Sequence, residues 1–139
     1  MKALLQTVFY FMAAIASAKA ALPVGTFGHG FTKVDGEPVW SIQAHSNGYK
    51  IFGHGDGKKR SAHLLTSAER KIFWSKMAWS FGSHQNAECI GVASELICYV
   101  PSQTRQSIPA LQLHLSDFFH YDKSGGIIEV RLLRTSKIK

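Results

Sequence analysis

Residues 89–98 read Cys-Ile-Gly-Val-Ala-Ser-Glu-Leu-Ile-Cys, two short apolar runs around a small central pair. Such a pattern predicts a β-hairpin. With residues 93–94 as a two-residue turn, Cys89 lies directly opposite Cys98 at a non-hydrogen-bonded position, where side chains approach most closely. The spacing therefore predicts a cross-strand disulfide. Ala-Ser is a poor turn sequence, and two buried free thiols are the alternative.

The first 20 residues have the pattern of a signal peptide. Lys2 gives a positive start, residues 3–16 are apolar apart from two positions, and residues 18–20 (Ala-Lys-Ala) match the small-x-small pattern that signal peptidases cut. The alternative is a membrane anchor, but a spanning helix needs roughly 20 apolar residues. We expect cleavage after Ala20, a secreted or periplasmic protein, and an oxidising compartment that favours the disulfide.

The remainder, residues 21–139, has the length of a single secreted domain. The whole chain has a formal net charge of +7, of which the signal peptide supplies two lysines and no acid, so the remainder carries +5. A basic surface favours an acidic protein, an acidic glycan, lipid headgroups or nucleic acid as partner. A solubility charge without a target is the alternative. We expect no membrane span after signal cleavage, since no later segment is long and apolar enough.

Two turn signals predict an antiparallel meander in the N-terminal third. Asp-Gly at residues 35–36 separates a strand at 31–34 from one at 37–46, because Asp-Gly supplies the positive φ angles that tight hairpin turns need. Counting outward from this turn places Phe31 opposite Trp40.

Asn-Gly at residues 47–48 has the same chemistry and leads into a third strand at 49–52. Counting outward from this second turn places His45 opposite Lys50.

A glycine-rich and basic segment follows at residues 53–60, which read Gly-His-Gly-Asp-Gly-Lys-Lys-Arg. Backbone N–H groups and three adjacent cations could bind an anion there, whereas a solvated connector between a hairpin and a helix is the alternative. The residues that we predict to contact a partner lie on or beside this loop: His45, Tyr49, His54, Lys58, Lys59 and Arg60.

A helix is predicted at about residues 67–80. Thr66 and Glu69 form the two halves of a capping box at its start.

Ile72 and Met77, with Ala68 or Phe73, form a stripe at helical spacing, which we expect to face the core. Trp74 lies off that stripe, so we expect the helix to be covered on more than one side.

The C-terminal third predicts further strands. Leucines alternate with polar residues over residues 111–115, as in a strand with one wet face. A last hairpin is expected from strands at 118–121 and 127–133 with a turn at 124–126. Together these elements predict an α+β, β-dominated fold: a small antiparallel sheet or barrel with one packed helix.

The motifs that would identify an enzyme or a metal site are missing from the sequence. It has no G-x-S-x-G, no P-loop and no HExxH, so we predict no cofactor and no metal site. Histidine acid–base chemistry stays open, because the chain has seven histidines. His45, His114 and Glu129 are the candidates for a secreted, ribonuclease-like hydrolase.

Without a catalytic constellation, we favour a non-enzymatic binding protein that contacts a protein or an anionic ligand outside the cytosol. Nucleic acid stays among the candidate ligands. Inhibitors, immunity proteins and effector-like proteins share this plan of leader, small β-rich domain and single disulfide, which is an analogy of architecture alone.

Overall fold

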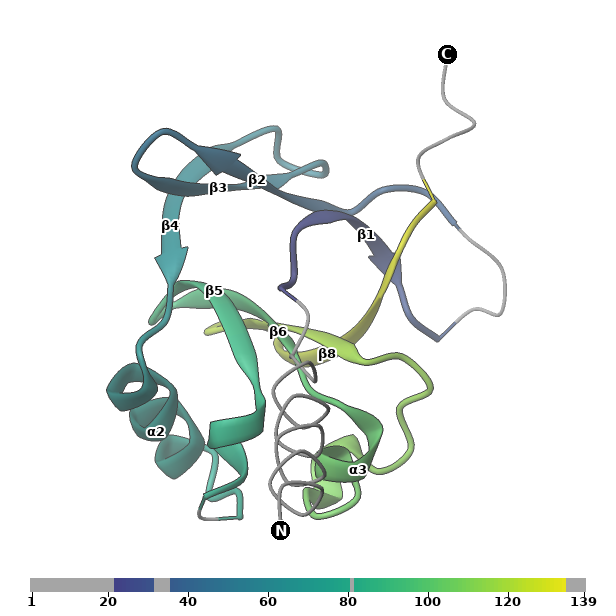
Figure 1. The fold of residues 1–139 in the computed structure, drawn as a ribbon. Coiled ribbons are helices and arrows are strands. Elements are labelled where there is room, and N and C mark those ends of the chain that lie inside the picture. The colour runs from purple at the N-terminus through teal and green to yellow at the C-terminus, as the bar shows by residue number, and fades with distance from the viewer. Residues whose placement is uncertain (1–21, 32–35, 81, 135–139) are drawn as a thin grey trace, which may run out of the picture.

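The computed structural model describes residues 22–31, 36–80 and 82–134, so the predicted signal peptide lies outside the described residues. In the described part of the chain, eight antiparallel strands form a closed barrel (Figure 1). Each strand pairs with its neighbour in sequence, and the last pairs back with the first. The prediction of a β-dominated antiparallel fold with a packed helix is confirmed.

The elements follow one another along the chain as β1 (Gly25–His29), β2 (Trp40–His45), β3 (Gly48–Gly53), β4 (Lys59–Leu64), α2 (Ser67–Lys76), η1 (Ser83–Asn86), β5 (Glu88–Val92), β6 (Glu95–Tyr99), α3 (Ser102–Arg105), η2 (Pro109–Leu111), β7 (Phe118–Asp122) and β8 (Gly126–Leu132).

Alternate side chains of the strands fill the barrel, as the two-residue period of a strand requires. The buried apolar side chains of this interior cluster are Phe27, Ile42, Ile51, Ala62, Ile90, Ile97 and Val130.

The outward side of β5, β6 and β7 is covered by the helical segments and their connections. The buried side chains of this second cluster include Cys89, Leu96, Cys98, Phe119 and Tyr121 from the strands, and Phe73, Trp74, Ile108 and Leu111 from the covering layer. Because both faces of these strands are buried, their sequences are nearly continuous apolar runs.

The predicted hairpin of β5 and β6 is confirmed in its register. Cys89 pairs with Cys98, and a disulfide joins them. Gly91 has a φ of 155°, and a Cβ there would lie 2.3 Å from the carbonyl oxygen of Glu95, so only glycine fits. The last hairpin, β7 with β8, is also found as predicted.

The helix α2 begins as predicted but ends earlier. Thr66 and Glu69 form both hydrogen bonds of the capping box. Ala78 has a φ of 58°, a left-handed conformation that cannot continue a helix, so α2 ends at Lys76 rather than near residue 80. The core assignment of Ile72 was wrong, because its side chain is 69% exposed.

Two neighbouring residues of α2 are buried in the core: Phe73, a predicted alternative member of the stripe, and Trp74, which lies off it. Phe73 and Trp74 are both buried because Trp79 folds back over them, with ring centroids 5.7 Å and 5.1 Å away. Met77 packs partly against the same cluster, as the helical stripe indicated.

The predicted pairing of the first two strands was wrong. The first strand is residues 25–29, and Trp40 pairs with Phe27 rather than with Phe31. This strand must also pair with β8 to close the barrel, which brings Phe27 into the interior and leaves Phe31 71% exposed. Part of the predicted Asp-Gly turn lies outside the described residues.

The second turn is displaced by one residue. His45 pairs with Gly48, so Lys50 faces Gln43 rather than His45. This register places the buried side chains of β2 and β3 side by side in the interior, which the turn chemistry alone could not indicate.

The predicted strand at residues 111–115 is absent. Leu111 is buried at the end of η2, but Leu113 and Leu115 are 92% and 78% exposed. In this closed barrel β7 already pairs with β6 and β8, so this segment finds no free edge. The backbone N–H groups of Leu115 and Ser116 instead donate to the Glu129 carboxylate.

Candidate functional site

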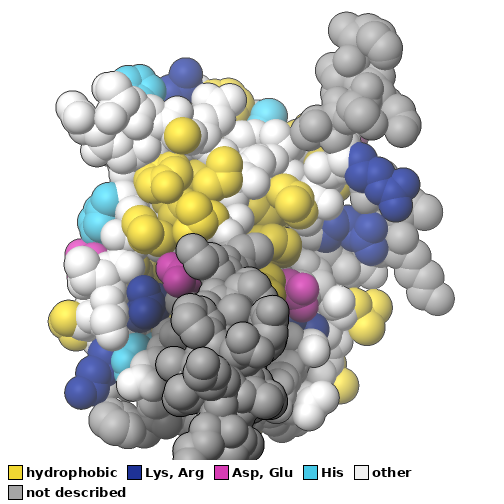
Figure 2. Space-filling view, viewed as in Figure 1, with side chains coloured by type: hydrophobic (Ala, Val, Ile, Leu, Met, Phe, Trp, Pro, Cys, Tyr) yellow, Lys and Arg dark blue, Asp and Glu magenta, His cyan; other side chains and the backbone are white. Residues whose placement is uncertain are grey.

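The outward side of β2, β3 and β4 contrasts with the covered side of the barrel. Ile42, Ile51 and Ala62 point inward, so the alternate residues of these strands point outward. The outward positions are Ser41, Gln43, His45, Lys50, Phe52, Lys59, Ser61 and His63, which we call the cationic face. The described helical segments bury their apolar side chains against β5–β7 instead. In Figure 2 histidine and lysine side chains lie along the upper edge, where Figure 1 places β2 and β3.

The cationic face holds two lysines, two histidines and no acidic residue. Lys50 Nζ donates to Ser61 Oγ at 3.2 Å, which holds one ammonium group against the strand surface. Lys59 is exposed and lies across the strands from the half-buried Phe52. The sequence prediction missed Lys50 and Phe52, although their alternation with the apolar Ile51 was the available signal.

His54 lies against the cationic face and contacts two of its residues. Its Nε2 lies 2.8 Å from Ser41 Oγ, which lies 3.0 Å from Thr26 Oγ1, and its ring meets Phe52 edge-on at 4.8 Å. Ser41 is 5% exposed, so its hydroxyl is enclosed by its neighbours and available mainly for positioning His54. The predicted contact residue His54 is therefore anchored beside Phe52.

The glycine-rich loop connects β3 to β4 and not to the helix. Its backbone donors serve the loop itself, since Gly53 N–H donates to the Lys58 carbonyl and Gly57 N–H to the Gly53 carbonyl. Asp56 accepts from the Lys58 N–H at 2.9 Å. That hydrogen bond, with the charges of Arg60 and Lys58, lowers the pKa of Asp56 although burial opposes the shift. The loop is thus a poor anion cradle, and Lys58 has an acidic neighbour.

Arg60, a predicted contact residue, points into the barrel. Its Nε and Nη2 donate to the two carboxylate oxygens of Glu95 at 2.7 Å and 3.2 Å. The Glu95 hydrogen bond is the largest effect that raises the pKa of Arg60. Arg60 faces inward because it pairs across the sheet with buried Ile51, so Glu95 engages its guanidinium. A contact of Arg60 with a partner stays a prediction.

Glu95 links Arg60 to a buried histidine. His120 Nε2 lies 3.0 Å from Glu95 Oε2, and the His120 ring stacks on Trp40 with centroids 3.8 Å apart. Burial raises the pKa of Glu95, but the hydrogen bonds from His120 and Arg60 outweigh it and lower the pKa overall. His120 is 1% and Glu95 9% exposed, so this carboxylate–imidazole pair is buried.

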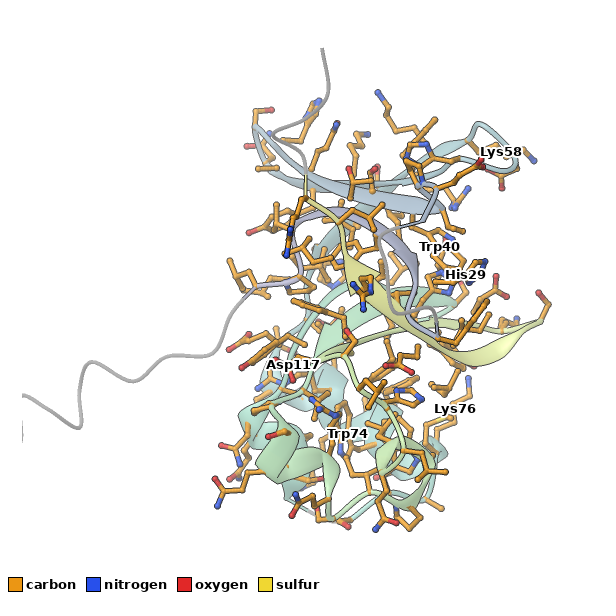
Figure 3. All side chains as sticks on the ribbon, turned by 90° about the vertical axis from the view of Figure 1, so that its right-hand side faces the viewer. His29, Trp40, Lys58, Trp74, Lys76 and Asp117 are labelled. Carbon is orange, nitrogen blue, oxygen red and sulfur yellow. A yellow bond between two sulfur atoms is a disulfide. The ribbon has the colours of Figure 1, made fainter. Side chains whose placement is uncertain are left out.

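Figure 3 shows Trp40 close to His29 within the barrel wall. Trp74 lies in the helical layer, and Lys58 is at the opposite end of the molecule from it.

Tyr49 was predicted as a surface contact but faces the interior. It is half-buried, packs against the interior cluster and pairs across the sheet with Ala62. His45 remains exposed at the end of β2, on the cationic face.

The three acid–base candidates fall in two parts of the fold. His114 lies in the connection after η2, near enough to Glu129 for the two charges to interact, and burial lowers the pKa of His114. Glu129 Oε2 accepts two backbone N–H groups at 2.6 Å each. His45, on β2, belongs to the cationic face instead.

Within the described ranges, no three His, Cys, Asp or Glu side chains gather as metal ligands would. The described part of the chain also contains no helix with the length and apolar character needed to cross a membrane. Comparison of the chain with known protein families, with curated proteins and with solved structures gave no match.

Proposed function

We propose that this protein is an exported, non-enzymatic binding protein whose cationic face contacts an acidic surface of a partner protein. One observation carries the proposal: the outward side of β2–β4 gathers lysines and histidines around an aromatic ring, these strands place no acidic residue there, and no described helix packs its apolar side chains there. Glu69 of α2 meets this face only at His63. Positive surfaces of this kind attract and orient negatively charged partners.

Export is part of the proposal. A disulfide between Cys89 and Cys98 is compatible with an oxidising compartment. Expression in an exporting host should give a protein that begins at residue 21 and contains no free thiol. A mature protein that still begins at Met1, with thiols open to alkylation, would refute the export step alone.

The physical basis of partner binding is a preorganised charge beside an apolar contact. Lys50 is already fixed by Ser61, so less side-chain entropy is lost when it meets a carboxylate. Phe52 supplies a ring that a partner could cover. Charges at an exposed surface are screened within about 10 Å at 0.1 M salt, so the interaction should weaken as salt rises.

The test measures binding of the purified protein to a fluorescent poly-aspartate peptide over a series of salt concentrations. The double variant Lys50→Gln/Lys59→Gln should bind about fivefold more weakly at low salt and show a smaller salt dependence. Lys71→Gln/Lys123→Gln is the matched control, since it removes the same charge from exposed sites outside this face. Equal weakening in both double variants would refute the cationic face as the binding surface. Tighter binding to single-stranded oligothymidine than to the peptide would redirect the assignment to nucleic acid.

A further inference from the structure

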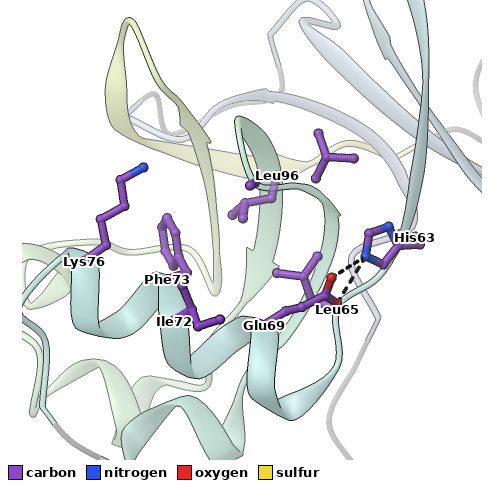
Figure 4. A pocket seen from close by; sticks show the side chains of 9 residues that line it. His63, Leu65, Glu69, Ile72, Phe73, Lys76 and Leu96 are labelled. Atoms are coloured by element: carbon purple, nitrogen blue, oxygen red, sulfur yellow. Dashed lines mark hydrogen bonds and ion pairs between the residues drawn. The ribbon is translucent and has the colours of Figure 1, made fainter.

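A small apolar pocket lies between α2 and the β5–β6 hairpin, and it meets the cationic face at His63. Its volume is about 180 Å³. Leu65, Phe73 and Leu96 form its buried floor, and Ile72, Val92 and Ala93 form its rim (Figure 4).

The side chains that α2 contributes to this pocket change in character along the helix. Glu69, Ile72, Phe73 and Lys76 are spaced three and four residues apart, so they share one face of α2. This face is acidic at its start, apolar in the middle and basic at its end. Figure 4 shows Lys76 at one end of the pocket and the His63–Glu69 pair at the other.

The two charged ends differ in their availability. The Glu69 carboxylate accepts the Thr66 N–H and lies 3.0 Å from His63 Nε2, and these contacts lower its pKa. Lys76 Nζ lies 5.6 Å above the centre of the Tyr121 ring, and none of the described ion pairs involves it. The pocket therefore combines an occupied acid with a cation that has no carboxylate partner among the described residues.

We propose that this pocket binds a small amphipathic anion, with a compact apolar body and one carboxylate. A dry apolar cavity of about 150 Å³ holds a benzene ring, so a pocket of about 180 Å³ admits a ligand of that class. The apolar body displaces water from the exposed side chain of Ile72 at the rim, and the carboxylate pairs with Lys76. A cationic ligand would meet this ammonium with like charge and should bind more weakly.

The experiment titrates the protein with benzoate and follows the methyl resonances of Leu65, Ile72 and Leu96 by NMR. A ligand of this size should bind with a Kd on the order of 1 mM. Benzyl alcohol should bind about three- to fivefold more weakly, because an exposed ion pair contributes little, and benzylamine more weakly still.

Two variants separate the apolar contact from the charge. Lys76→Gln should bind benzoate and benzyl alcohol equally, whereas Lys71→Gln, an exposed lysine on the same helix, should keep the preference for benzoate. Ala93→Phe fills the pocket from an exposed turn and should abolish the shifts for both ligands while the thermal unfolding stays cooperative.

Three results would overturn the proposal. The first is the absence of shifts at these methyl groups with benzoate at about tenfold the expected Kd. The second is equal binding of benzoate and benzylamine by the unmodified protein. The third is unchanged binding in a folded Ala93→Phe variant.

Discussion

The two halves of the barrel wall are built from the same kind of hairpin but use their outer sides differently. β2–β4 leave polar and cationic side chains on the outside, whereas β5–β7 place Leu96, Phe119 and Tyr121 there, under the helical layer. Both halves share one interior cluster. The difference teaches that tight packing is concentrated on one side of this small barrel, which leaves the other side for the proposed recognition. Single substitutions can probe each side.

The largest expected effect is the loss of an aromatic anchor in the covering layer. Trp74 is 2% exposed, and its Nε1 donates to Ser83 Oγ at 2.7 Å. Trp74→Ala should lower the free energy of unfolding by about 3–5 kcal/mol, because it leaves a large cavity and removes the hydrogen bond to Ser83. Urea denaturation measures this. Ile72→Ala on the same helix is the control and should cost less than about 1 kcal/mol; a larger loss at Ile72 would mean that the covered side is assigned wrongly.

The disulfide ties the hairpin at the centre of the covered half. Replacing both Cys89 and Cys98 by alanine should lower the free energy of unfolding by about 2–3 kcal/mol, the value expected for a short loop. Denaturant midpoints of the unmodified protein with and without reductant give an independent measure. No difference between oxidised and reduced protein would contradict this role.

A smaller loss in the free energy of unfolding is expected for Arg60, on the inward side of β4. Arg60→Met leaves the Glu95 carboxylate, 12% exposed, with His120 as its partner. Since the Arg60 side chain is 34% exposed, solvent reduces the cost, and we expect a loss of about 2 kcal/mol. Lys59→Met, the neighbouring outward residue, should change stability by less than about 0.5 kcal/mol. Similar losses in the two variants would show that the inward–outward alternation of β4 is misassigned.

The smallest expected effect is the change in stability with pH. Burial and the charges of Arg70 and Lys71 lower the pKa of His84, and burial lowers that of His114. The unfolded chain therefore binds protons below pH 6.5 that the folded protein does not, so stability should fall as the pH drops below 6.5.

Glu95 acts in a second, lower window. Its folded pKa lies below the ordinary 4.5, so its contribution is present above pH 4.5 and is lost as the pH falls through the folded pKa. Melting temperatures from pH 8 to pH 3 should show both declines. The double variant His84→Gln/His114→Gln should remove much of the first decline; an unchanged profile would contradict the assignment.

Local sequence signals predicted the elements that local chemistry determines. The capping box of α2 and the pairing of Cys89 with Cys98 follow from spacings of three and nine residues. The apolar runs of β5 and β6 indicated strands but not what covers them. Barrel closure, which moved the partner of Trp40 from Phe31 to Phe27, depends on the distant strand β8 and has no local signal.

For the same reason, the sequence could not indicate which side of its strand each predicted contact residue lies on. His45 and Lys59 do lie on the cationic face, but Arg60 and Tyr49 point inward. Which side of a strand faces inward depends on the register with its neighbours, and a shift of one residue reverses it. The Arg60–Glu95 pair joins residues 35 positions apart, a distance at which turn counting carries no information.

Two phenylalanines that both point outward, one on each half, test the central separation most directly. Phe119 on β7 is 1% exposed beneath the helical layer, and Phe52 on β3 is half-buried on the cationic face. Urea unfolding of the two alanine variants should show a loss of about 3–5 kcal/mol for Phe119→Ala and of about 1 kcal/mol or less for Phe52→Ala. Equal losses would contradict the account, because they would mean that the outer side of β2–β4 is packed as tightly as that of β5–β7.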